Sequence, residues 1–144
     1  MKITTVIDKE REEEIIIYLH EENKISAEIE SLVSKRESRL VGYDGDAMLN
    51  VCFEDVVCFL TEEGRVYALL DKGRVRVRER LYELEAILGT DFIKLNQSCI
   101  ANISRIKRFD VTLGGALRVE FKNGYREYVS RRQMKNVKER FLRK

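Results

Sequence analysis

Short apolar runs alternate with turn-forming residues over most of the chain, a pattern typical of β-strands joined by tight turns. After Ser38, each run is followed by a turn that contains Gly, Asp or Asn. The pairs Gly114-Gly115 and Asn123-Gly124 favour hairpin connections. Because hairpins join neighbouring antiparallel strands, the pattern predicts a mainly β, antiparallel fold with minor α content.

Three segments instead indicate helices. In residues 23–38 apolar positions recur at helical spacing, and Asn23 can cap the helix at its start. In residues 78–89 the apolar positions share one helical face, and Gly89 can end the helix. The chain then closes with residues 131–144, which we expect to form a basic helix.

The first 37 residues differ in texture from the remainder. Residues 2–8 alternate as a strand does, and residues 15–20 form a β-branched run of strand length. With the helix that follows, they predict a β-β-α extension at residues 1–37, ahead of a second unit at residues 38–144. The extension is too small to fold alone, so it must pack against the domain or a partner.

Composition describes a globular chain. It has 144 residues, of which 44% are hydrophobic and 36% are charged, enough for one domain with an appendage and a real core. The longest uncharged apolar run, residues 15–19, is too short to span a bilayer, and the N-terminus has no apolar signal core. We therefore expect a cytoplasmic protein.

Chemistry-bearing residues are scarce. The three cysteines are odd in number and form no CxxC pair, which favours free, mostly buried thiols over a disulfide framework or a zinc site. His20 is the single histidine, and no catalytic set can be assembled around it. The glycine pairs are turns and do not cradle phosphates. We expect no enzymatic activity, no cofactor or metal, and no small-molecule substrate.

The small net charge of +2 hides an asymmetry along the chain. Residues 89–144 carry 14 Lys and Arg against 5 Asp and Glu, whereas residues 1–88 carry 13 against 20. Opposite polarity suggests that the C-terminal part meets a polyanion and the N-terminal part meets something else. Charge alone leaves open the alternative that both parts simply have solvated faces.

The strongest β-forming segment, residues 91–109, is interrupted by Asn96, Gln97 and Ser98. These residues either turn the chain, or present amides that can bond adenine edges in a major groove. Nearby cations could meet phosphates, which position a protein without reading sequence. The cations are Lys94, Arg105, Lys107 and Arg108.

The segments FIKLNQSCIANISRIKRF and LRVEFKNGYREYVSRRQMKNVKERF resemble the C-terminal core of the LytTR family of bacterial DNA-binding domains. The upstream strand pair and short helix also fit, so the resemblance covers about residues 38–144. The matching positions are Phe92, Ser98, Asn102, Ile106, Asn123-Gly124 and Ser130-Arg131-Arg132.

The resemblance implies an elongated set of small antiparallel β-sheets with a C-terminal helix, whose loops enter successive major grooves. Three loops are implied: the hairpin at residues 61–65, the turn at Asn96-Gln97, and the start of the last helix. Many members have His and Arg at the second loop, whereas this chain has Asn96 and Gln97, which keep hydrogen-bonding ability but lose a positive charge. Ser130 is expected to cap the last helix, and Asn102 is expected to be structural. The residues expected to contact DNA are Arg65, Lys94, Asn96, Gln97, Arg105, Lys107, Arg131, Arg132 and Lys135.

The resemblance also implies partners. Most members carry a receiver domain, which 37 residues cannot build, so the chain resembles small stand-alone LytTR regulators. These are often encoded beside an integral membrane protein that can hold the regulator inactive. We expect a sequence-specific transcriptional regulator that binds double-stranded DNA as a homodimer. Residues 1–37 would dimerise, dock the membrane partner, or merely cover a sheet edge. The rival function is a protein-interaction module with little DNA affinity.

Overall fold

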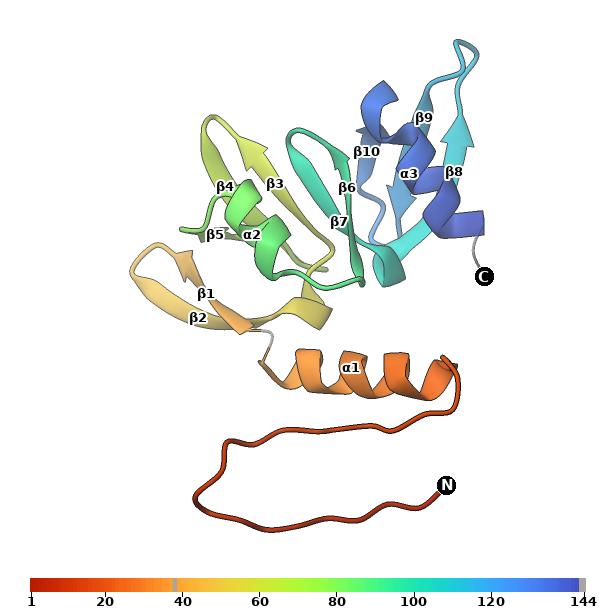
Figure 1. Ribbon diagram of the computed structural model, residues 1–144. Coiled ribbons are helices and arrows are strands. Elements are labelled where there is room, and N and C mark those ends of the chain that lie inside the picture. The colour runs from red at the N-terminus through yellow and green to blue at the C-terminus, as the bar shows by residue number, and fades with distance from the viewer. Residues whose placement is uncertain (38, 143–144) are drawn as a thin grey trace.

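The computed structural model describes residues 1–37 and 39–142. Ser38, where the predicted boundary between extension and domain falls, lies outside the described residues, as do the last two residues of the predicted C-terminal helix. The described chain folds into two antiparallel sheets and three α-helices (Figure 1). The helices are α1 (Lys24–Glu37), α2 (Leu81–Ile87) and α3 (Arg131–Leu142).

The larger sheet has seven strands in the order β2-β1-β5-β4-β3-β7-β6, and the smaller has three in the order β10-β9-β8. All paired strands are antiparallel. The mainly β, antiparallel prediction is therefore confirmed. The strands are β1 (Arg39–Asp44), β2 (Ala47–Cys52), β3 (Cys58–Glu62), β4 (Arg65–Leu69), β5 (Arg74–Val77), β6 (Phe92–Asn96), β7 (Cys99–Asn102), β8 (Ile106–Val111), β9 (Leu117–Phe121) and β10 (Arg126–Val129).

The large sheet has an apolar cluster on each face. On one face, Val66, Val75 and Val77 pack with Leu84 of α2 and with Phe59, whose ring lies edge-on to that of Phe53. Between them, these side chains are almost wholly removed from solvent. Burial of this kind is the main favourable contribution to folding.

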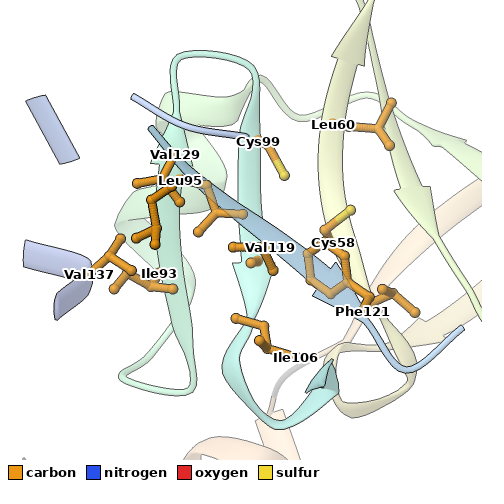
Figure 2. Close-up of a cluster of buried hydrophobic side chains, with 13 residues drawn as sticks. Cys58, Leu60, Ile93, Leu95, Cys99, Ile106, Val119, Phe121, Val129 and Val137 are labelled. Atoms are coloured by element: carbon orange, nitrogen blue, oxygen red, sulfur yellow. The ribbon is translucent and has the colours of Figure 1, made fainter. Parts of the chain in front are cut away.

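The second cluster joins the two sheets (Figure 2). Cys58 and Leu95 from the large sheet meet Phe121 from the small sheet and Val137 from α3. The pKa of the Cys99 thiol is raised by its hydrogen bond with Cys58 and by burial, which keeps the thiol protonated. All three cysteines are free, and Cys58 and Cys99 are buried.

The N-terminal extension departs from its predicted β-β-α form. The helix is present as α1, and the Asn23 side chain accepts a hydrogen bond from the Ile25 backbone N–H at 2.9 Å, as a cap does. Residues 2–8 and 15–20, however, form no strand ladder; they run as an extended trace outside the two sheets (Figure 1). Both segments run extended, as their patterns indicate, but they pair with none of the described strands.

Asn102 is structural, as its position before the 3₁₀ turn Ile103–Arg105 requires. Its side chain is 2% exposed, and its Nδ2 donates to the Val56 carbonyl at 2.8 Å. Its Oδ1 accepts from the backbone N–H and the hydroxyl of Ser104 at 3.2 and 2.9 Å. The amide therefore ties the end of β7 to the chain that enters β3.

We predict that Asn102→Ala lowers the free energy of unfolding by about 2 kcal/mol. The substitution leaves the buried Val56 carbonyl and the Ser104 N–H without their hydrogen-bond partners. Urea denaturation followed by circular dichroism measures the change. Asn50→Ala, at an exposed position of β2, is the matched control and should change stability by less than about 0.5 kcal/mol. Equal losses in the two variants would contradict the structural role of Asn102.

Candidate nucleic-acid interface

Three turns and the start of α3 lie along one edge of the molecule, the upper edge in Figure 1. Antiparallel pairing of Leu60 with Cys99 places the β3–β4 and β6–β7 turns at the same strand ends. The β8–β9 turn and the β10–α3 junction reach the same side in the view of Figure 1. We call this set the loop edge: residues 62–65, 96–98, 112–116 and 130–132.

Hydrogen bonds fix three of these loops relative to one another. The Thr61 N–H donates to the Ser98 carbonyl at 2.8 Å, which joins the first turn to the second. The Ser130 N–H donates to the Leu95 carbonyl at 2.9 Å, which joins the start of α3 to β6. The three loops therefore form one rigid unit, although residue 61 and residue 130 are far apart in sequence.

Asn96 is at the centre of this unit and is not available to DNA. Its side chain is 1% exposed. Its Oδ1 accepts from the Ser98 N–H at 2.8 Å, and its Nδ2 donates to the Tyr128 carbonyl at 2.9 Å and to Glu127 Oε1 at 3.2 Å. The prediction that Asn96 reads bases is therefore corrected. The oxygen and the nitrogen of its buried amide both form hydrogen bonds within the protein, and these bonds hold the turn to β10.

A second polar side chain, that of Tyr125, contacts the same Glu127 carboxylate that Asn96 contacts. The Tyr125 hydroxyl donates to Glu127 Oε2 at 2.8 Å. Burial, with the hydrogen bond to Glu127, raises the pKa of Tyr125, so the phenol stays protonated and remains a donor. Both oxygens of Glu127 are thus engaged within the protein.

Four of the predicted contact residues are exposed at the loop edge: Gln97, Arg65, Arg131 and Arg132. Gln97 follows the buried Asn96, so the turn directs it outward. The two arginines open α3, where the Ser130 carbonyl accepts the first helical bonds from residues 133 and 134. Lys135, four residues after Arg131, lies on the same exposed helical face. The structure therefore brings five of the nine predicted contact residues together.

The other three cations lie elsewhere. Lys94 is half-buried within β6, and its Nζ lies 3.7 Å from Glu85 Oε2 of α2. Arg105 donates to Asp71 Oδ2 and to the Glu54 carbonyl, both at 2.9 Å. Asp71 belongs to the β4–β5 turn, which is at the opposite end of the strands from the loop edge.

Lys107 is exposed, but it follows Ile106, which pairs with Phe121 beside the β9–β10 turn. That turn is also at the end of the strands away from the loop edge. The predictions for Lys94, Arg105 and Lys107 are therefore not supported by their positions. Arg105 and Lys107 are close to the Asn96-Gln97 turn in sequence but far from it in space, because β7 leads the chain away from the loop edge.

Two features of the loop edge add to the sequence prediction, which included the hairpin at residues 61–65 but not its backbone conformation. The β8–β9 turn joins it and presents Leu113 fully to solvent. In the β3–β4 turn, Glu63 and Gly64 have φ of 52° and 75°, as in the tight turn that suits a twisted hairpin. The Glu-Gly pair in the predicted hairpin could have signalled this turn conformation, but the place of the β8–β9 turn depends on tertiary pairing.

Among residues 1–37 and 39–142, no group of three or more His, Cys, Asp or Glu side chains is arranged to hold a metal ion. Across the same residues, no helix combines the length and apolar content needed to cross a membrane.

Comparison with known proteins gives a consistent result. The family model described as the LytTr DNA-binding domain matches residues 46–142. A relative from Staphylococcus aureus strain MSSA476, named an uncharacterized HTH-type transcriptional regulator, is 29% identical over 145 residues, covering 97% of each chain. A relative of the same name from strain NCTC 8325 is 29% identical over 122 residues, covering 81% of this chain and 83% of its own.

Among solved structures, the fold matches the LytTr DNA-binding domain of a Bacillus cereus protein described as a methyl-accepting/DNA response regulator. The TM-score is 0.68 at 22% sequence identity, covering 72% of this chain and 96% of that domain. Within the described residues, five strands separate α2 from α3, so these two helices do not form a helix-turn-helix pair. The family match spans most of the domain that carries the loop edge, and the chain belongs to the LytTR family of DNA-binding domains.

Proposed function

We propose that the protein is a sequence-specific DNA-binding regulator of transcription whose loop edge enters successive major grooves. One observation carries the proposal: Gln97 and Arg132 are exposed on loops that hydrogen bonds hold as one unit at a single edge. A duplex passing along that edge meets both loops without any change of fold. Its place of action is the bacterial cytoplasm, where the DNA lies.

The exposed side chains suit distinct tasks. The Gln97 amide can bond an adenine edge through two hydrogen bonds, and Arg132 can do the same with guanine. The start of α3 adds backbone N–H groups and the positive end of the helix dipole, which favour a phosphate. Arg65 and Lys135 would contact the backbone and fix the position of the protein on the duplex.

The N-terminal extension supports a second element of the proposal, association with a second copy of the chain. Ten apolar side chains are exposed there, and Ile3, Ile7 and Tyr18 are each at least 87% exposed. A buried aliphatic side chain removes roughly 100 Å² of apolar surface from water. The set therefore offers on the order of the ~800 Å² per partner that a standard interface buries. The residues are Met1, Ile3, Val6, Ile7, Ile15, Ile16, Tyr18, Ile25, Leu32 and Val33.

Two further observations favour a second copy as the occupant. The extended backbone of residues 2–8 and 15–20 has unpaired strand-forming groups, which a symmetric partner would satisfy by strand pairing. The match to the MSSA476 relative covers 97% of this chain, so that relative shares nearly all of the extension. The match to the solved LytTr domain covers 72% of this chain. A dimer would place two loop edges on half-sites about one or two helical turns apart.

We predict that Arg132→Ala and Gln97→Ala both weaken binding to a DNA site selected from a random pool. Each should cost about 1–3 kcal/mol, because each removes a base contact, and Gln97→Ala should also relax preference at one base position. Fluorescence anisotropy with the selected duplex and its single-base variants measures both effects.

Lys107→Ala is the matched control, because it removes an exposed cation at the opposite end of the strands. It should leave affinity within about twofold of the unchanged protein and leave the thermal midpoint unaltered. If neither loop variant alters binding more than Lys107→Ala does, the loop edge is not the DNA-binding surface.

We predict that Ile16→Asp shifts the full-length protein from dimer to monomer, because it places a charge in the apolar surface of the extension. Multi-angle light scattering across a concentration series measures the mass. Tyr82→Asp, on an exposed part of α2, is the control and should leave the dimer intact. A full-length chain that is monomeric throughout the series would contradict self-association and leave the extension to another occupant, such as an integral membrane regulatory protein.

A further inference from the structure

One exposed sheet face that adjoins the loop edge has an organised set of cations and aromatic rings. On β5, Val75 and Val77 point into the core, so the alternating Arg74 and Arg76 project from the opposite face. Arg78 continues the alternation and is exposed. None of these three arginines belongs to the predicted contact set. We call the set Arg65, Arg74, Arg76, Arg78, Tyr43 and Tyr67 the arginine face.

Strand register brings these residues into one row. Arg76 is paired with Tyr67 of β4 on one side and with Tyr43 of β1 on the other. Paired residues share a face of the sheet, so the two rings flank the guanidinium position. Tyr43 and Tyr67 are half-buried, which leaves part of each ring on the surface.

The rings also hold the neighbouring guanidinium groups. The Arg74 guanidinium carbon lies 4.1 Å from the centre of the Tyr67 ring, and that of Arg78 lies 4.4 Å from the centre of the Tyr43 ring. Stacking of this kind orients a planar guanidinium while its N–H groups stay free to donate. The arrangement reduces the conformational entropy that two long side chains lose on binding an anion.

Most of the positive charge on this face is not neutralised within the protein. Among the ion pairs of the described residues, Arg74 is the one member of the four arginines with a carboxylate partner, Glu62. Arg65, Arg76 and Arg78 remain as surplus cations. A surface with three surplus arginines, of which Arg78 is oriented by stacking, suits phosphates, which accept the paired N–H bonds of a guanidinium.

The arginine face is continuous with the loop edge. Arg65, which belongs to both, closes the β3–β4 turn opposite Glu62. Arg76 lies two residues further along the sheet, a distance of about 7 Å. From β4 to β1 the face is about 10 Å wide, which corresponds to about three base-pair steps of rise along the duplex axis.

We propose that the arginine face binds phosphates of the duplex that flanks the segment held by the loop edge, so that the bound DNA curves around the β4–β5 side of the domain. This rests on the proposed function, because it extends the path of the same duplex. Continuity with the loop edge at Arg65 favours DNA over an acidic protein segment, because one duplex can contact both surfaces.

The test compares two duplexes with the full-length protein. One carries the selected site alone, about 20 base pairs or two helical turns, and the other adds about one helical turn on each side. The variant is Arg76→Ala with Arg78→Ala, and the control is Lys107→Ala with Lys122→Ala, which removes two exposed cations at the far strand ends. Anisotropy across a salt series gives affinities and salt slopes, and energy transfer between dyes at the duplex ends reports curvature.

The unchanged protein should bind the longer duplex more tightly and bring its ends closer together. The arginine variant should lose most of that gain, lower the salt slope by about two on the longer duplex, and bind the short duplex as before. Arg76→Lys with Arg78→Lys should keep the salt slope while reducing curvature, because a lysine keeps the charge, loses the paired N–H groups of a guanidinium and, at position 78, loses the stack on Tyr43. The control should match the unchanged protein on both duplexes.

Other results overturn the inference. If the arginine variant binds both duplexes as the unchanged protein does, the face does not contact DNA, while the proposed function stands. If that variant alters the mass of the protein but not its DNA binding, the face serves a protein contact. If the unchanged protein binds neither duplex, the proposed function fails together with the inference.

Discussion

The loop edge depends on the hydrogen bonds that cross between separate hairpins at their turns. A hairpin turn by itself can move relative to its neighbours, because its own ladder fixes only two strands. Here the Asn96 side chain and the backbone groups of Thr61 and Ser130 join three loops from different parts of the chain. In the buried environment of Asn96, breaking one of these bonds would leave polar groups unpaired, which is costly. The protein can therefore present irregular loops with a precision that helices or strands more often provide.

The sequence was sufficient to predict the secondary structure of the domain and its antiparallel pairing. Turn residues such as Asn123-Gly124 and the alternation of apolar residues are local signals. In the domain, these signals coincide with the turns and strands of the structure. The same signals failed for residues 2–8 and 15–20, because a strand requires a partner as well as a pattern. Local sequence specifies extended backbone, whereas pairing depends on what lies beside it.

The candidate site was only partly predictable for a related reason. Adjacent residues in the turn, Asn96 and Gln97, look equivalent in sequence, yet one is buried and the other exposed. Arg105 and Lys107 looked like flanking cations because they follow the turn closely, and the fold carries them to the other end of the strands. The arginine face was missed because register, which sets Arg76 beside Tyr43 and Tyr67, is a long-range property.

The acidic connection between the two apolar runs of the extension has a consequence for the newly made protein. Residues 8–14 contain one Asp and four Glu, and they interrupt what would otherwise be a long stretch prone to stack into cross-β aggregates. Charged gatekeepers of this kind keep exposed strand-forming segments dispersed until a specific contact forms. Under the self-association proposed above, a chain released from the ribosome at low abundance would stay dispersed, and its assembly would respond to how much of it the cell has made.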